Sequence, residues 1–140
     1  MAVGVISGIG LKGGAIAATV AHDSHNLLVV GDSNADMLAA VKALEACQGG
    51  YAIAAEGKAL MLQPLPVAGL FTDDPDSDIE ENVAEMLRLA RKMGVREGID
   101  PFTTLSFMAL PVIPELRVTD AGVYDVSEGK ILIPARKIGE

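Results

Sequence analysis

The stretch AIAATVAHDSHNLLVV, residues 15–30, decides the fold of this chain. Two apolar runs, 15–21 and 27–30, consist mainly of small, β-branched and leucine residues, and this composition predicts two buried β-strands. The polar loop between them gathers both histidines of the protein together with an acid, a hydroxyl and an amide. A connection between two buried strands does not need these groups, so the loop is the first candidate for a functional site.

The segment before these strands is apolar and rich in glycine. Residues 2–9 predict a further strand, and because it begins almost at Met1, we take it as a sign that the chain was cut from a longer one. Residues 10–14 predict a turn. The run GIGLKGG at 8–14 superficially resembles a phosphate-binding loop, but it lacks the Gly-Lys-Ser/Thr ending and precedes a strand, so we favour the turn.

Two helices are predicted in the middle of the chain. Ser33 can cap the first, whose apolar residues follow helical spacing and which ends at the glycines of 49–50. Ser77 and Glu80 form a capping box for the second, which carries one apolar stripe over 79–93. The acidic connector 73–78 before it is either a solvated loop or a cation site, and we favour the loop.

A third, short helix is predicted from Asp100-Pro101 to about Leu110, because Asp caps helices well and Pro fits the first helical position. Its hydroxyls either satisfy the polar edge of a ligand or bond to carbonyls of the preceding turn. These hydroxyls belong to Thr103, Thr104 and Ser106.

Hairpins account for the remaining strands. Residues 51–55 and 59–63 flank Glu56-Gly57, which is typical of a tight hairpin turn. The tail predicts three short strands at 116–118, 123–126 and 130–133. Because hairpin-length links outnumber crossover-length links, residues 1–140 are predicted to form one α+β domain, a mainly antiparallel β-sheet packed with about three α-helices.

Composition excludes several classes of partner. The formal net charge of −8 argues against nucleic acid, whose phosphates require clustered Lys and Arg. No apolar run reaches the roughly 18–20 residues of a membrane-spanning helix, so no membrane is expected either. A single cysteine, Cys47, cannot form an internal disulfide, and nothing at the amino end resembles a signal sequence, so a cytoplasmic location is expected.

The polar loop leaves three interpretations open. His22, Asp23 and His25 together could supply three metal ligands. Alternatively, the loop contacts a substrate or acts as an acid or base. From spacing alone we favour a third interpretation, in which His22, Asp23 and Asn26 hydrogen-bond to the backbone of a tight turn. Ser24 beside His25 is only weak evidence for a hydrolase, because no Gly-x-Ser-x-Gly motif occurs.

Cysteine-based chemistry is not supported. A zinc deaminase of the nucleoside type needs a Pro-Cys-x-x-Cys motif, and one cysteine excludes it. Cys47 lies late in a predicted helix with no histidine near it in sequence, which favours a packed residue over a nucleophile.

Three segments resemble the carboxy-terminal domain of bacterial adenine deaminases. The first runs over 10–31, from GLK through VAHDSHN to LVVG. The second is LQPLPVAGL at 62–70, similar to the LPLPIAGL stretch of the family. The third, 100–116, runs from DPF to PVIPEL and is similar to the family's DPFxTLSFLALPVIPEL. Together they cover nearly the whole chain.

The resemblance implies hydrolysis of adenine to hypoxanthine and ammonia, as in the amidohydrolase superfamily. It also implies a divalent metal, manganese, iron or zinc, whose ligands lie in a separate barrel domain and begin with a His-x-His motif. This chain has no His-x-His. We therefore expect no metal or other cofactor in this chain, a barrel partner in cis or in trans, and no deaminase activity from the chain alone.

The resemblance assigns a role to the polar loop, because the family shows the same signature. It implies that the loop binds substrate or closes the active site, with hydrogen bonds to the purine or to the network around the activated water. The residues concerned are His22, Asp23, Ser24, His25 and Asn26.

Two rival hypotheses remain. In the first, the chain is a non-catalytic binding module whose apolar strands form contacts in a homo-oligomer. In the second, less favoured, His22, Asp23 and His25 form an independent metal site.

Overall fold

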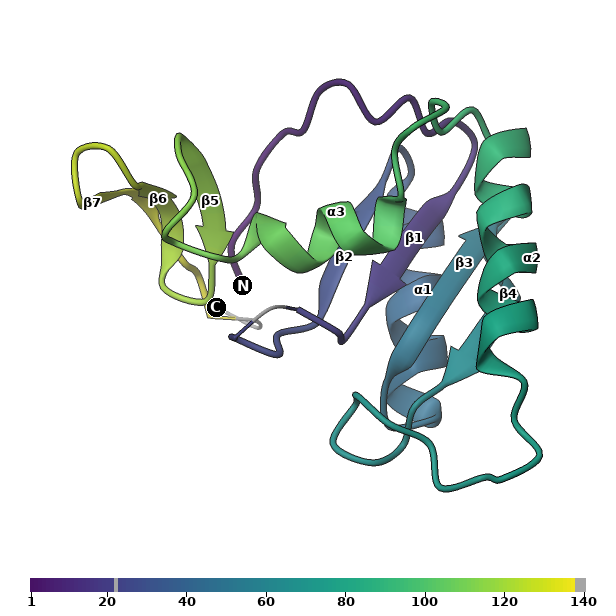
Figure 1. The fold of residues 1–140 in the computed structure, drawn as a ribbon. Coiled ribbons are helices and arrows are strands. Elements are labelled where there is room, and N and C mark those ends of the chain that lie inside the picture. Colours follow the sequence, from purple (N-terminus) through teal and green to yellow (C-terminus); the bar gives the residue numbers. More distant parts are fainter. Residues whose placement is uncertain (22, 138–140) are drawn as a thin grey trace.

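The computed structural model describes residues 1–21 and 23–137, and all structural statements below refer to these residues. They form two antiparallel sheets and three helices (Figure 1). The elements are β1 (Ala15–Ala18), β2 (Leu28–Gly31), α1 (Asn34–Ala46), β3 (Gly50–Ala55), β4 (Lys58–Pro64), α2 (Ile79–Lys92), α3 (Pro101–Met108), β5 (Leu116–Thr119), β6 (Gly122–Asp125) and β7 (Lys130–Pro134). The predicted α+β class is confirmed.

The large sheet has the strand order β2-β1-β3-β4. The two strands predicted around the polar loop pair with each other, from Ala15 opposite Gly31 to Ala18 opposite Leu28. Because β1 lies between β2 and β3, it is buried along its whole length. The predicted hairpin at Glu56-Gly57 joins β3 to β4, and both turn residues have positive φ, as hairpin turns of this length require.

Alternation along β1 and β3 separates the core into two layers. Neighbouring residues of a strand point to opposite faces, so alanines lie on one face of the sheet and isoleucines on the other. The alanine face packs against Ala40 and Leu44 of α1. Because alanine side chains are short, α1 lies close to the sheet. These sheet residues are Ala15, Ala17, Ala52 and Ala54, opposed to Ile16 and Ile53.

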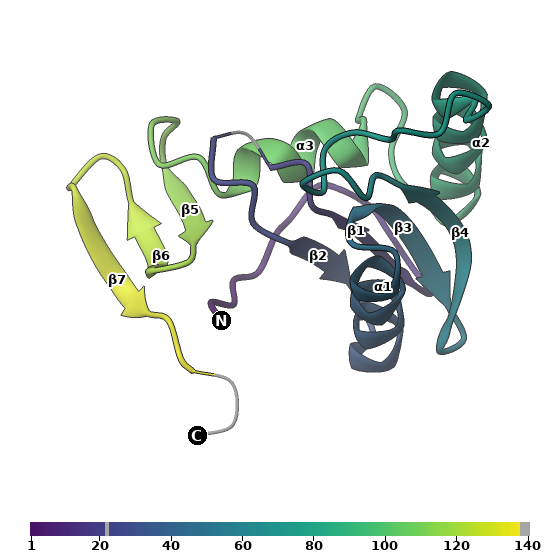
Figure 2. The same cartoon turned by 90° about the horizontal axis from the view of Figure 1, so that it is seen from below.

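The isoleucine face is covered by α2 and α3. Met86 and Ala90 of α2 and Phe102 and Leu105 of α3 join Ile16 and Ile53 in one buried cluster. Figure 2 shows the resulting layers, with α1 on one side of the large sheet and the other two helices on the opposite side. None of the helices in the described part of the chain is both long and apolar enough to cross a membrane.

The helix starts agree with the sequence in two cases out of three. Ser33 caps α1 and Asp100 caps α3 as predicted. The predicted capping box of Ser77 and Glu80 is wrong, because Asp78 is the N-cap of α2 and accepts a hydrogen bond from the Glu81 amide at 3.0 Å. Ser77 instead accepts a hydrogen bond from the Gln63 side chain at 3.5 Å.

The hydroxyls of α3 serve the helix itself. Thr104 donates to the Asp100 carbonyl and Ser106 donates to the Thr103 carbonyl, both at 2.7 Å, while Thr103 donates to the Asp100 carboxylate at 2.9 Å. Bonding to carbonyls of the preceding turn, the second alternative, thus holds for Thr104 and Ser106, whereas Thr103 bonds to the capping carboxylate. They are therefore not available to satisfy a ligand without breaking bonds inside the helix.

The predicted strand over 2–9 is wrong. Glycines interrupt the segment, Gly8 has φ of +93°, and Val5 is fully exposed, so no continuous ladder forms. Its backbone is held at its ends, where Ile9 accepts from the Arg96 amide at 3.1 Å and Met1 accepts from the Arg136 amide at 2.8 Å. Apolar composition alone therefore does not make this segment a strand, because its glycines interrupt the extended backbone.

The tail forms the small sheet, with the order β5-β6-β7, which confirms the three predicted strands. It stands beside the helix-covered layers (Figure 2) and contacts them through α3 and β5. All five residues of β7 are exposed.

Candidate functional site

The polar loop leaves the large sheet where β1 ends and β2 begins. Ala18 and Leu28 are the last paired residues, and residues 19–27 connect them. The connection lies at the same end of the strands as the 64–71 segment that follows β4 (Figures 1 and 2). Two of the three segments that resemble adenine deaminases thus meet at one end of the large sheet.

Thr19 fixes the base of the loop. Its hydroxyl donates to the Gly69 carbonyl at 2.7 Å and accepts from the Gly50 amide at 2.8 Å, and its own amide donates to the Gly50 carbonyl at 3.0 Å. A Cβ on Gly69 would lie 3.0 Å from this hydroxyl, and one on Gly49 would lie 2.8 Å from it. The segments therefore approach closely because two glycines face one threonine.

Sequence reasoning did not identify Thr19, Gly49 or Gly69. The only signal available was that GL at 69–70 belongs to the second family-like segment. The partners are separated by as many as fifty residues, so the joint arises from tertiary packing and not from a local pattern.

Backbone hydrogen bonds close the turn of the loop. The Ala21 amide donates to the Thr19 carbonyl at 3.0 Å, and the His25 amide donates to the Ala21 carbonyl at 2.9 Å. Asp23 and His25 adopt left-handed backbone conformations with φ of 60° and 48°. Asp and His are among the residues enriched in this region, which gives part of the reason for their presence here.

The described polar residues of the loop differ in exposure. Asp23, Ser24 and His25 are exposed, and Asn26 is half-buried. His22 lies outside the described residues. The structure thus brings four of the five candidate residues together in one turn, three of them exposed and Asn26 half-buried.

A metal site does not fit the described residues. Among residues 1–21 and 23–137, no group of three or more His, Cys, Asp or Glu side chains is placed to hold a metal ion. The hypothesis of a site at His22, Asp23 and His25 involves a residue outside this range. The connector 73–78 is a loop in which Asp74 accepts a hydrogen bond from the Asp76 amide at 3.0 Å. Cys47 packs beside the alanine face.

The opposite end of the same strand pair carries the clearest electrostatic feature. The Asp32 carboxylate accepts from the Gly13 amide at 2.7 Å and from the Gly14 amide at 3.0 Å. These two hydrogen bonds favour the charged form and lower the pKa of Asp32. Within the core, burial raises the pKa of Tyr51, and the charge of Asp100 adds to this effect.

Known proteins match this chain over most of its length. The sequence model of the adenine deaminase C-terminal domain matches residues 1–130. The adenine deaminase of Nitratidesulfovibrio vulgaris strain DP4 is 53% identical over 125 residues, which cover 89% of this chain and 22% of that protein. Adenine deaminase 2 of Carboxydothermus hydrogenoformans is 52% identical over the same shares, and the adenine deaminase of Bacillus pumilus is 45% identical over 90% of this chain.

The fold and the site define an α+β domain that presents a polar loop at one end of a helix-covered antiparallel sheet. The chain belongs to the adenine deaminase C-terminal domain family. It spans about a fifth of the length of the curated relatives it matches.

Proposed function

We propose that this domain completes the active site of an adenine deaminase, which hydrolyses adenine to hypoxanthine and ammonia. The polar loop, residues 22–26, would close over a substrate held by a metal-binding barrel domain, in the same polypeptide or in another. Family membership supports the reaction class, because the relatives that match over about nine-tenths of this chain carry the name adenine deaminase.

The observation that carries this role is the exposure of Asp23, Ser24 and His25 on a turn whose base is fixed. The turn is closed by backbone atoms, and its base is held by Thr19, so hydrogen bonding by Ser24 and His25 is not what closes it. Both side chains are exposed. An exposed polar loop held on a rigid sheet is typical of a binding function.

The chemistry of the loop suits a purine. A carboxamide such as that of Asn26 can donate one hydrogen bond and accept another, and this pattern complements the donor and acceptor pairs on the edge of adenine. Imidazole and hydroxyl groups can each donate or accept, so His25 and Ser24 suit a network around a reacting water. These residues would orient the purine or that network.

The barrel partner would supply the part of the reaction that this chain does not. A divalent metal ion, manganese, iron or zinc, lowers the pKa of a bound water and so provides a nucleophile at neutral pH. The described residues offer no metal site of their own, and the proposal places none here. A cytoplasmic location is part of the same proposal, since purine bases are available there.

A chimera tests the proposal. The 140-residue chain replaces the matched segment of the Nitratidesulfovibrio vulgaris adenine deaminase, and ammonia release from adenine is measured with manganese, iron or zinc. We expect the chimera to turn over adenine and the isolated chain to be inactive. A loop variant, His25→Gln with Asn26→Ala, should lose about 10²-fold or more in kcat/KM, as expected when groups that position a substrate are removed.

The control variant is Asp73→Asn with Asp74→Asn, which alters two exposed polar side chains in the connector before α2. It should retain the activity of the unmodified chimera. Full activity of the loop variant, or an inactive chimera that contains its full complement of metal, contradicts the proposal. Adenine turnover by the isolated chain would refute the requirement for a partner.

A second candidate, a non-catalytic assembly module, is favoured by the exposed apolar residues of β7. Titrating adenine while following the imidazole signals of the two histidines by NMR separates the two. Shifts confined to those signals support substrate contact. Unchanged signals together with a concentration-dependent mass support assembly.

A further inference from the structure

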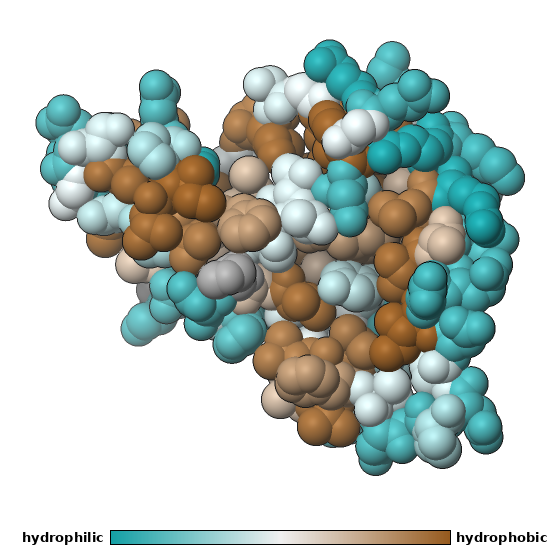
Figure 3. All heavy atoms as spheres, in the orientation of Figure 1, coloured by the Kyte–Doolittle hydropathy of each residue, from teal (hydrophilic) through white to brown (hydrophobic). Residues whose placement is uncertain are grey.

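The small sheet exposes more apolar surface than a solvated sheet normally does. Ile131, Leu132 and Ile133 of β7 are 48%, 45% and 58% exposed, and Leu116 of β5 is 50% exposed. Figure 3 shows apolar side chains gathered on this part of the molecule. β7 is also an edge strand with one unpaired row of backbone groups. Strands that are apolar on both faces are usually covered on both faces.

The register of β7 shows that both faces of the small sheet carry exposed isoleucines. Ile133 lies opposite Val123 and Ile131 lies opposite Tyr124, with an irregularity between them. Cross-strand partners share a face, and Val123 and Tyr124 are neighbours that point to opposite faces. The two isoleucines therefore lie on opposite faces of the small sheet.

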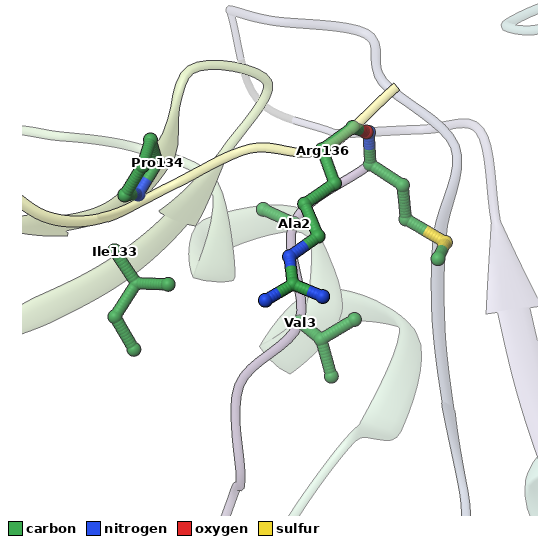
Figure 4. A pocket seen from close by; sticks show the side chains of 6 residues that line it. Ala2, Val3, Ile133, Pro134 and Arg136 are labelled. Carbon is green, nitrogen blue, oxygen red and sulfur yellow. The ribbon is translucent and has the colours of Figure 1, made fainter. Parts of the chain in front are cut away.

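A hollow lies against each of these faces. One, of about 350 Å³, lies between the first residues of the chain and β7, and Figure 4 shows Ala2 and Val3 on one side of it and Ile133 on the other. The second, of about 310 Å³, is lined by Ile131 and Tyr124 together with Pro111 and the β5–β6 turn. Each hollow thus includes one of the two exposed isoleucines.

The amino end of the chain lies beside the small sheet. Met1 and Arg136 exchange two backbone hydrogen bonds, and a Cβ on Gly4 would lie 2.9 Å from a Val118 methyl of β5. In the longer relatives this domain is carboxy-terminal and makes up 22% of the chain. The polypeptide that precedes it in those proteins must therefore enter next to β7.

We infer that the small sheet is the docking surface for the domain that precedes this one in the longer adenine deaminases, with β7 and its two faces buried in that interface. The inference deepens the proposed function, on which it rests, because it names the surface on which the barrel partner sits. In the longer relatives the preceding polypeptide joins this domain beside β7, which favours the preceding domain over a second copy of this domain as the partner on this surface. The polar loop belongs to the large sheet and is separate from this surface.

Hydrogen exchange on the chimera and on the isolated chain tests the inference without measuring activity. We expect the amides of 130–133 to exchange at least about tenfold more slowly in the chimera, because burial of an edge strand suppresses local opening. The apolar edge of the large sheet provides a matched position, since Leu60 of β4 is 51% exposed. Amides around Leu60 should exchange equally in both proteins.

Two variants complete the experiment, Ile133→Thr in β7 and Leu60→Thr in β4, both at exposed positions where Thr suits a strand. In the isolated chain neither should shift the melting temperature appreciably. In the chimera only Ile133→Thr should lower it. Equal exchange of the 130–133 amides in the two proteins, or equal effects of the two variants in the chimera, overturns the inference. An isolated chain that sediments as a dimer and becomes monomeric with Ile133→Thr would assign the surface to a second copy instead.

These outcomes are distinct from failure of the proposed function. If the small sheet docks the preceding domain but the polar loop has no role in the reaction, β7 is protected and the loop variant stays active. If the loop functions but the docking surface lies elsewhere, the loop variant is inactive and β7 exchanges alike in both proteins.

Discussion

The large and the small sheet are built from similar antiparallel strands but differ in what covers them. In the large sheet, β1 is entirely buried because helices pack on both faces and strands pair on both edges. In the small sheet, β7 is entirely exposed although three of its five residues are large and apolar. The comparison teaches that apolar sequence coincides with burial in the large sheet but with exposure in β7 of the small sheet.

The edge strands show the same contrast. β4, at the edge of the large sheet, contacts both α1 and α2, and Gln63 within it is buried and bonded to Asn82 at 2.8 Å. Among the packed elements of the structure, β7 contacts mainly β6. The edge strand β4 is therefore packed against helices of its own domain. The edge strand β7 is held mainly by its pairing with β6.

The largest difference between the sheets is expected for truncation of an isoleucine. Ile53→Ala in β3 removes a fully buried side chain between α2 and α3, and it should destabilise the fold by about 2–5 kcal/mol. Ile131→Ala in β7 should cost about 1 kcal/mol or less in the isolated chain. Urea unfolding of both variants measures this, and similar losses would erase the distinction between the two sheets.

A threonine in each sheet gives a smaller effect. Thr19→Val removes a hydroxyl that both donates to Gly69 and accepts from Gly50, and it should cost about 1–3 kcal/mol. Thr119→Val in β5 removes one donated bond, to the Gly122 carbonyl at 2.9 Å, and should cost less, about 1 kcal/mol. Denaturant midpoints decide the order. A larger loss for Thr119→Val would mean that Thr19 does not fix the base of the loop.

The smallest effect is expected at Asp32, at the end of the large sheet opposite the loop. Its pKa is lowered in the native state by the Gly13 and Gly14 amides, so the charged form stabilises the fold. This contribution is present above the unfolded-state pKa of about 3.9 and is lost as the pH falls through the native pKa. Asp32→Asn should therefore lower the urea midpoint at pH 7, and the difference should shrink between pH 4 and lower pH.

Asp73→Asn controls for the change in net charge in that experiment. It should leave the midpoint nearly unchanged at every pH. If the deficit of Asp32→Asn stayed constant from neutral to acidic pH, the two glycine amides would not be what lowers the pKa of Asp32.

Local signals made much of the fold predictable from sequence. The β-branched and small residues on each side of the polar loop, the Glu56-Gly57 turn, and the caps Ser33 and Asp100 each act within a few residues, and each appears in the structure as expected. The start of α2 was misplaced by one residue because Ser77 and Asp78 can both cap a helix, and Gln63 occupies the serine.

Features that depend on distant partners were not predictable. Whether 2–9 forms a strand depends on pairing with another strand, and this segment pairs with none of the described strands. The joint between Thr19 and Gly69 depends on packing across fifty residues. For the candidate site, the sequence identified the loop residues by resemblance, and the structure added that Asp23, Ser24 and His25 are exposed on an anchored turn.

The most direct test of the central claim is a crystal structure of the chimera with adenine bound. If the polar loop completes the active site, a side chain of Asp23, Ser24, His25 or Asn26 lies within about 3.5 Å of adenine or of a water bonded to it. A structure in which adenine occupies the barrel while none of these four side chains lies within about 3.5 Å of adenine or of such a water would contradict the claim.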